Sequence, residues 1–229
     1  YRGEIIVNDA DNCLVASYTN SSNFPTTASA FQTTTGTQQD GVIFKFNSDL
    51  SALIWSTFLG GTGDDACYGI RVDDNDDVYV TGTAANNDFP SISGGAYPHH
   101  QGSTRDGFIA KLNSSGSSMF AFTFYGTDQQ DQSFFLDLDY NDYVYIYGQS
   151  SGSIPVEPVG IYSNSGSHQF IAKFNNSLSS VSFSTVFGSG GSSTDISPSA
   201  FMVDQCGRIY TSGHGGSGIP TSPNPLQTS

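Results

Sequence analysis

A repeat of about 65 residues constrains the fold of this chain more than any other sequence feature. Its first marker is an apolar residue, then an Asp/Asn-rich turn, then an apolar run that is rich in tyrosine. Successive copies are 65, 66 and 65 residues apart, beginning at Val7, Val72, Leu138 and Val203. A fixed period of this length indicates tandem copies of one supersecondary unit.

Three further markers recur in the same order in the chain. A Phe-Pro or Ile-Pro step follows the first marker and begins at residues 24, 89, 154 and 219. The first three copies then contain a lysine within an apolar run, followed by an aromatic run that ends in glycine. All three lysines of the chain occupy this one repeat position: Lys45, Lys111 and Lys173. Coincidence does not explain four markers in constant order.

Each repeat predicts two antiparallel hairpins. The first pairs residues 68–72 with 78–83 across the Asp/Asn-rich turn, and the second pairs residues 108–112 with 119–125 across a turn of Asn, Ser and Gly. No segment has the apolar spacing of a helix. Tandem four-stranded units predict an all-β fold, a β-propeller with four-stranded antiparallel blades. A β-sandwich is the alternative, but it does not predict markers at a constant spacing.

The period divides the chain into about three and a half blades. We expect one partial propeller over residues 1–229, with blades at about 3–60, 66–126 and 131–188 and a half blade at 199–229. Complete propellers have roughly four to eight blades. We therefore expect this chain to be part of a longer protein.

Charge and composition exclude several partners. The chain has 7 Lys and Arg against 21 Asp and Glu, a formal net charge of −14. Nucleic acid and anionic membrane surfaces need basic surfaces, so neither is expected as a partner. No apolar run of about 18 residues is present, and membrane insertion is not expected either. Cys13, Cys67 and Cys206 lack Cys-x-x-Cys spacing, and we interpret them as small apolar residues.

One Asp-rich turn has a pattern that suggests calcium. Asp73, Asn75 and Asp77 alternate as at the start of a calcium-binding loop, but the glycine and the closing glutamate of an EF-hand are absent. Asp and Asn also favour tight turns by themselves. We interpret these residues as turn formers, with calcium as the alternative, and expect no other metal or cofactor.

Repeated charged residues are interpreted as structural, because a catalytic group is normally single while a scaffold residue recurs with its blade. Aspartates directly precede the first strand of successive blades, where a carboxylate can accept backbone N–H bonds and join neighbouring blades. The lysines are expected to bond a neighbouring strand or turn. These positions are Asp65, Asp131, Asp195, Lys45, Lys111 and Lys173.

The loops between the second and third strands are the most interesting places for binding. Residues 84–106 and 149–168 are long, polar and aromatic, and binding residues concentrate on loops held by a rigid scaffold. The alternative is that the apolar residue and proline of each loop only fix it to the blade. We interpret the adjacent pair His99 and His100, in the first of these loops, as solvated. The possible ligand rim consists of Phe89, Tyr97, His99, His100 and Tyr162.

Two short motifs resemble catalytic or phosphate-binding sequences. Residues 148–152 fit Gly-x-Ser-x-Gly and residues 213–218 fit Gly-x-Gly-x-x-Gly. Both motifs require a following helix, and neither has one in the predicted pattern. We therefore expect no catalytic residues.

Several motifs together resemble the bacterial β-propeller repeat family called SBBP. They are Ser56 to Asp65, Val72-Asp73, Tyr79 to Gly82, Asp88 to Pro90 and Asp106 to Asn113. The resemblance implies a secreted or cell-surface protein, often a long multidomain cargo of type IX secretion in gliding bacteria. It also implies an adhesin-like or scaffolding role, and the family has no general catalytic site.

Two functions from different classes follow. The first is a non-catalytic extracellular propeller module of a larger secreted or surface protein, with a protein or glycan on a surface, the rest of the polypeptide and the secretion machinery as partners. The alternative is a carbohydrate-active enzyme, a lyase or glycoside hydrolase. A glycosidase would need two carboxylates about 5–10 Å apart around a sugar.

Overall fold

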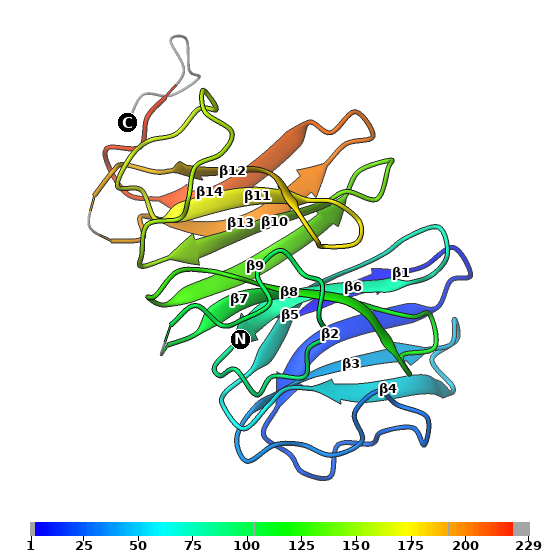
Figure 1. Ribbon diagram of the computed structural model, residues 1–229. Coiled ribbons are helices and arrows are strands. Elements are labelled where there is room, and N and C mark those ends of the chain that lie inside the picture. Colours follow the sequence, from blue (N-terminus) through cyan, green and yellow to red (C-terminus); the bar gives the residue numbers. More distant parts are fainter. Residues whose placement is uncertain (1–2, 103, 192, 222–229) are drawn as a thin grey trace.

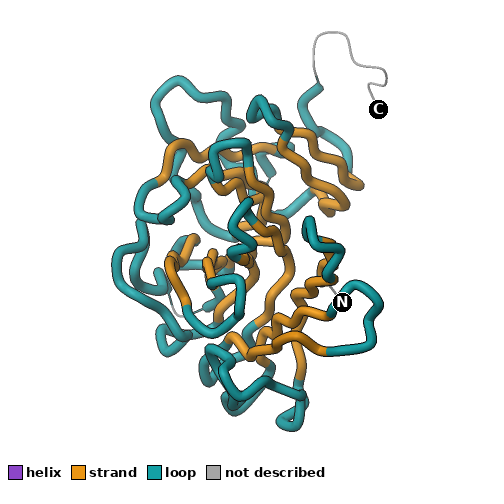
Figure 2. Tube along the Cα trace, turned by 90° about the vertical axis from the view of Figure 1, so that its right-hand side faces the viewer, coloured by secondary structure: helices purple, strands orange, loops and turns teal. Residues whose placement is uncertain are grey.

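Four sheets follow one another along the chain, one for each copy of the repeat (Figure 1). The structure is a computed structural model that describes residues 3–102, 104–191 and 193–221. In these ranges the regular secondary structure consists of β-strands alone, as Figure 2 shows. This confirms the all-β prediction. No helix long and apolar enough to cross a membrane occurs in the described part of the chain.

The first three sheets each contain four antiparallel strands in chain order. The first has β1 (Glu4–Val7), β2 (Cys13–Thr19), β3 (Asp40–Phe46) and β4 (Leu53–Leu59). The second has β5 (Ala66–Val72), β6 (Val78–Ala84), β7 (Asp106–Leu112) and β8 (Met119–Tyr125). The third has β9 (Asp131–Leu138), β10 (Val144–Ser150), β11 (Gln169–Phe174) and β12 (Val181–Phe187). The fourth has, in the described residues, β13 (Ile196–Val203) and β14 (Ile209–Gly215).

These sheets confirm the predicted blade architecture of a partial propeller, and we name them blades A to D in chain order. Blade D begins at Ile196, before the predicted start at about residue 199, and residues 222–229 of the predicted half blade lie outside the described residues. The pairing of β13 with β14 shifts register between Pro198 and Ala200. Since a proline and a bulge break the alternating pattern of a strand, this start was hidden in the sequence.

Both faces of a blade are apolar, because successive residues of a strand point to opposite sides of the sheet. In β6, Val80 packs into the core between blades A and B, whereas Tyr79 packs into the core between blades B and C. The pattern recurs one blade later in β10, where Ile146 faces blade B and Tyr147 faces blade D. Each core is therefore shared by two consecutive repeats.

Polar side chains join the first strands of successive blades. Arg71 of β5 lies between Glu4 of β1 and Asp137 of β9, with Nη1 2.6 Å from Glu4 Oε1 and Nε 2.9 Å from Asp137 Oδ1. Glu4 also accepts the N–H of Ile70, and Asp137 that of Val203 in β13. These contacts fix the position of each first strand relative to the next, across all four blades.

In blades A, B and C the loop between the second and third strands runs along the outer strand. The N–H of Phe58 in β4 donates to the carbonyl of Gln32, and that of Phe124 in β8 to the carbonyl of Tyr97, both at 3.0 Å. Blade C has an equivalent bond in which the loop is the donor. The loops thus occupy strand edges that would otherwise be open to pairing with other chains.

Replacement of Phe108 by alanine tests the shared core between blades A and B, where this ring is fully buried. The cavity left behind should lower the free energy of unfolding by about 3–5 kcal/mol. The matched control is Phe120→Ala, because the Phe120 side chain is 55% exposed and should cost less than about 1 kcal/mol. Urea unfolding measures both, and equal effects would contradict the assigned packing.

Candidate functional site

The Asp-rich hairpin turn repeats in detail in blades B, C and D. In blade B, Asp73 Oδ1 accepts the N–H groups of Asn75 and Asp77, each at 3.0 Å. The residue between them, Asp76, has a φ of 64°, a left-handed conformation that Asp and Asn tolerate. The turns of blades C and D have the same pair of bonds to their first aspartate.

The three repeat lysines bond these turns. Lys111 Nζ lies 2.9 Å from Asp73 Oδ2 in its own blade, and the equivalent contact in blade C is 2.8 Å. Lys45 of blade A instead reaches across to Asp76 of blade B, at 2.9 Å. The first turn of blade A begins with Asn8, an uncharged amide, and its Nδ2 also donates to Asp76. The ammonium therefore pairs with the nearest carboxylate, which belongs to the next blade.

The calcium candidates Asp73, Asn75 and Asp77 lie together in this turn. Both oxygens of Asp73 already have donors, two backbone N–H groups on Oδ1 and Lys111 on Oδ2. Lys111 Nζ also lies 3.3 Å from Asp77 Oδ2, so one ammonium contacts both carboxylates. Among the described residues, no three His, Cys, Asp or Glu side chains form a group suited to a metal ion.

The aspartates before each first strand bond the connection from the preceding blade. Asp65 Oδ2 accepts the N–H of Gly61 at 2.6 Å, and its Oδ1 accepts that of Ala85 at 2.7 Å. Burial raises the pKa of Asp65 to about 6, although both hydrogen bonds oppose this. Asp131 and Asp195 each accept one N–H at 2.6 Å, in each case from the connection that precedes their own blade.

A second set of buried carboxyls, Asp40 and Asp106, begins the third strands of blades A and B. Asp106 Oδ2 accepts the N–H of Gln101 at 2.6 Å, while Oδ1 has no hydrogen-bond partner. Burial raises the pKa of Asp106 to about 6, and nearby Asp131 adds to the rise. Sequence reasoning missed this pair, although an Asp-Gly step before the repeat lysine in two copies was the available signal.

Buried carboxyls with raised pKa values can indicate the acid of a glycosidase. Asp40, Asp106 and Asp131 are fully buried here, and Asp65 is 1% exposed. A sugar cannot reach carboxyls at the junction of two blades. We therefore assign them to the scaffold.

The predicted rim needs correction at two residues. Phe89 is 2% exposed and packs on Phe108, since the apolar residue before the proline folds back under its loop. His100, expected to be solvated, is 7% exposed, and its ring nitrogens face the carbonyls of Ala84 and Gly102 at 3.1 and 2.9 Å. Neither side chain therefore offers surface for contact with a ligand.

The other three rim residues retain some exposure. Tyr97 is half-buried against Tyr125, with ring centroids 5.6 Å apart. His99 is exposed, and Tyr162 is 64% exposed. The structure therefore does not bring the five predicted residues together in one site.

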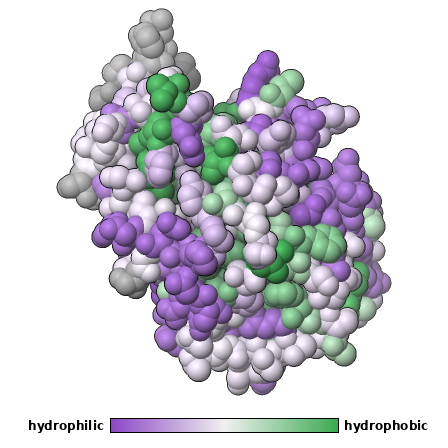
Figure 3. Space-filling view, viewed as in Figure 1, coloured by the Kyte–Doolittle hydropathy of each residue, from purple (hydrophilic) through white to green (hydrophobic). Residues whose placement is uncertain are grey.

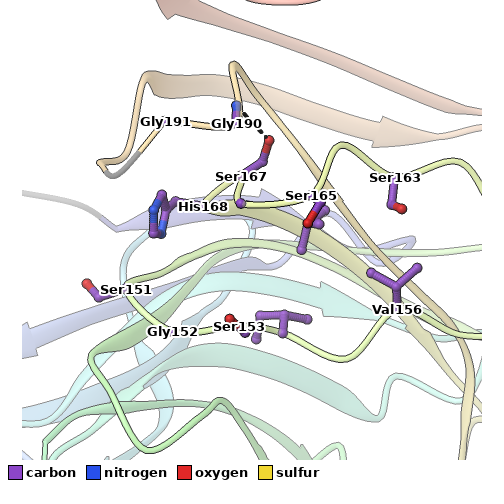
Figure 4. A pocket seen from close by; sticks show the side chains of 13 residues that line it. Ser151, Gly152, Ser153, Val156, Ser163, Ser165, Ser167, His168, Gly190 and Gly191 are labelled. Carbon is purple, nitrogen blue, oxygen red and sulfur yellow. Dashed lines mark hydrogen bonds between the residues drawn. The ribbon is translucent and has the colours of Figure 1, made fainter.

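A cavity of about 470 Å³ lies in blade C between the loop segments 151–156 and 163–168, beside Gly190 and Gly191 (Figure 4). Its lining includes Ile154, which occupies the repeat position of Phe89 in blade B and is a smaller side chain. Ser167 Oγ accepts the N–H of Gly190 at 3.2 Å and joins two of the segments. Serines contribute many hydroxyls to the lining: Ser151, Ser153, Ser163, Ser165 and Ser167. We name it the serine cavity.

The serine cavity lacks the contacts of a hydrolase. His168 Nδ1 lies 2.7 Å from the carbonyl of Ser150, and in the described part of the chain no serine hydroxyl is hydrogen-bonded to this ring. Ser150, the serine of the Gly-x-Ser-x-Gly match, is buried, and its Oγ accepts the N–H of Gly152 at 2.9 Å. Since nucleophilic catalysis requires a base on the hydroxyl, this geometry suits binding of a polar group.

Replacement of Lys111 by methionine tests the lysine contacts with the turn. It should lower the free energy of unfolding by about 1–3 kcal/mol, because Asp73 keeps a nearly buried carboxylate without its cation. The double variant Lys111→Met/Asp73→Asn should recover part of the loss. An unchanged melting temperature in Lys111→Met would show that the contact does not stabilise the blade.

Replacement of Asp106 by asparagine tests the buried carboxyl. Its pKa is about 6 in the fold and about 3.9 in an unfolded chain. Folding thus favours the protonated carboxyl. Its contribution to folding stability is complete below pH 4 and is lost as the pH rises through 6. Asparagine stays neutral at every pH. The stability of Asp106→Asn relative to the natural chain should rise by about 1–3 kcal/mol between pH 4 and 8; a constant difference would contradict this.

Comparison with known proteins finds a family model that matches one segment of the chain. Residues 54–90 match the family model for the SBBP beta-propeller repeat. The segment runs from within β4 through β5 and β6 to the Phe-Pro step of blade B. The chain has no match among curated proteins. This chain therefore carries a β-propeller repeat of the SBBP family at residues 54–90, as its sequence motifs indicated.

Proposed function

We propose that this chain is a non-catalytic, extracellular module of a larger secreted or surface protein, and that it binds a partner on a surface. The observation that carries this proposal is the serine cavity: many hydroxyls, two loop segments fixed by hydrogen bonds, and no activated nucleophile. Rigid scaffolds that present loops of this kind are common binding platforms.

The surface supports recognition through cavities. On the face in Figure 3, apolar residues form small separate groups among hydrophilic ones. The net charge of −14 further favours neutral or basic partners over anionic ones.

Delivery by type IX secretion, with an adhesive or scaffolding role, is the biological setting that we propose. Its support is the resemblance of the motifs to SBBP proteins and the acidic composition with few lysines. Antibodies against the chain should label intact cells or the culture supernatant. Labelling that requires cell lysis would contradict this location.

Filling the serine cavity tests the binding role. Ser165→Trp places a large ring at the cavity, and Ser115→Trp is the matched control because Ser115 is an exposed serine in a distant hairpin turn. Purified bacterial exopolysaccharide and outer-membrane vesicles are the two probes, and each is passed over the immobilised chain. Ser165→Trp should weaken binding at least tenfold, and the control should not.

Turnover is measured on the same exopolysaccharide, as reducing ends and unsaturated products. None should form, because the described residues that line the cavity include no carboxylate to act on a glycosidic bond. If cleavage of the polysaccharide persists after further purification of the chain, the alternative function, a carbohydrate-active enzyme, would be favoured. Equal binding by the two tryptophan variants would remove the serine cavity from the proposal.

A further inference from the structure

A second cavity, separate from the serine cavity, lies among blades A, B and C. It has a volume of about 420 Å³, within the range of small-molecule sites. Each of the three blades contributes at least two of its lining residues. They include Tyr18, Gln39, Tyr68, Arg105, Gln132 and Gln149. We name it the three-blade cavity.

Two β-bulges supply aromatic rings to this cavity. The pairing of β5 with β6 shifts register at Tyr68, and that of β9 with β10 shifts at Phe134, so each is the extra residue of its strand. A bulge turns a side chain away from the regular alternation of its strand. Both side chains line the cavity, with ring centroids 5.8 Å apart.

The polar groups of the cavity are held in place by neighbouring backbone and side chains. Gln39 Nε2 donates to a backbone carbonyl at the start of blade B at 3.0 Å, and Gln149 Nε2 does so to one at the start of blade D at 2.7 Å. Arg105 Nη2 lies 2.9 Å from Asp64 Oδ2. Such preorganised groups lose little entropy when a ligand binds.

The residues that line the cavity stand at equivalent repeat positions, but their side chains differ from blade to blade. Tyr18 and Gln149 each pair with the residue four positions before a repeat lysine, and the equivalent residue of blade B is Thr83. Gln39 and Arg105 both lie six positions before their lysine. The fold tolerates different side chains at these positions, so the blade itself does not require those that line the cavity.

The chemistry of the lining points to one class of ligand. The amides of Gln39 and Gln149 each keep a second N–H donor and an acceptor oxygen beside their backbone bond. The charge of Arg105 is paired with Asp64, and none of the lining residues is acidic. Aromatic rings add apolar faces with polar edges. Closely spaced hydroxyls on a ring with C–H faces complement this surface. We propose that the three-blade cavity binds a neutral sugar unit of a glycan.

The test compares two glutamine variants of the full chain on an array of neutral glucose-, galactose- and mannose-terminated oligosaccharides. Gln132 lines the cavity, and Gln129 is an exposed glutamine just outside β9. Gln132→Ala should weaken binding to the recognised oligosaccharide at least tenfold, and Gln129→Ala should leave it unchanged. Equal melting temperatures of both variants and the natural chain establish that folding is intact.

Two results would overturn the proposal. One is binding of no neutral oligosaccharide by the natural chain, and the other is equal binding by the two glutamine variants. Ser165→Trp, which fills the serine cavity, should leave oligosaccharide binding unchanged. Loss of oligosaccharide binding in Ser165→Trp alone would place the sugar in the serine cavity instead. Failure here would leave the module's proposed binding of exopolysaccharide or vesicles through the serine cavity standing, because that test uses a different variant.

Discussion

A central blade of this protein cannot bury its own apolar surface, because both faces of its four-stranded sheet carry large side chains. The alternation of β6, with Val80 on one side and Tyr79 on the other, leaves each face in need of a neighbouring sheet. Stacking of consecutive repeats satisfies this requirement. The period near 65 residues is therefore a consequence of packing, since every copy must present the same two faces.

Polar contacts between blades set the arrangement that apolar packing leaves open. Arg71 bridges Glu4 and Asp137 along the first strands, and Lys45 bonds the turn of the next blade. Buried carboxyls such as Asp65 hold the connections. Most charged groups that repeat are thus committed to the scaffold, and the side chains that differ between blades are left for recognition.

The sequence predicted the repeated elements well, because each marker reflects a physical need that recurs. Alternation, Asp-rich turns and the position of Lys111 could be read from one repeat and checked in the next. Contacts between repeats could not be read this way. The burial of Phe89 and His100 depends on how a loop folds back, and the bulges at Tyr68 and Phe134 are visible only in strand register. The lining of the serine cavity includes Ile154, where blade B has the larger Phe89.

The central claim is that consecutive repeats stack face to face and that contacts between their first strands fix how they are arranged. A double-mutant cycle on Arg71→Met and Asp137→Asn tests it directly, because the two residues belong to different blades and their atoms lie 2.9 Å apart. Urea unfolding of the natural chain, both single variants and the double variant should give a coupling energy of about 1 kcal/mol. Strictly additive effects would contradict the stacked arrangement.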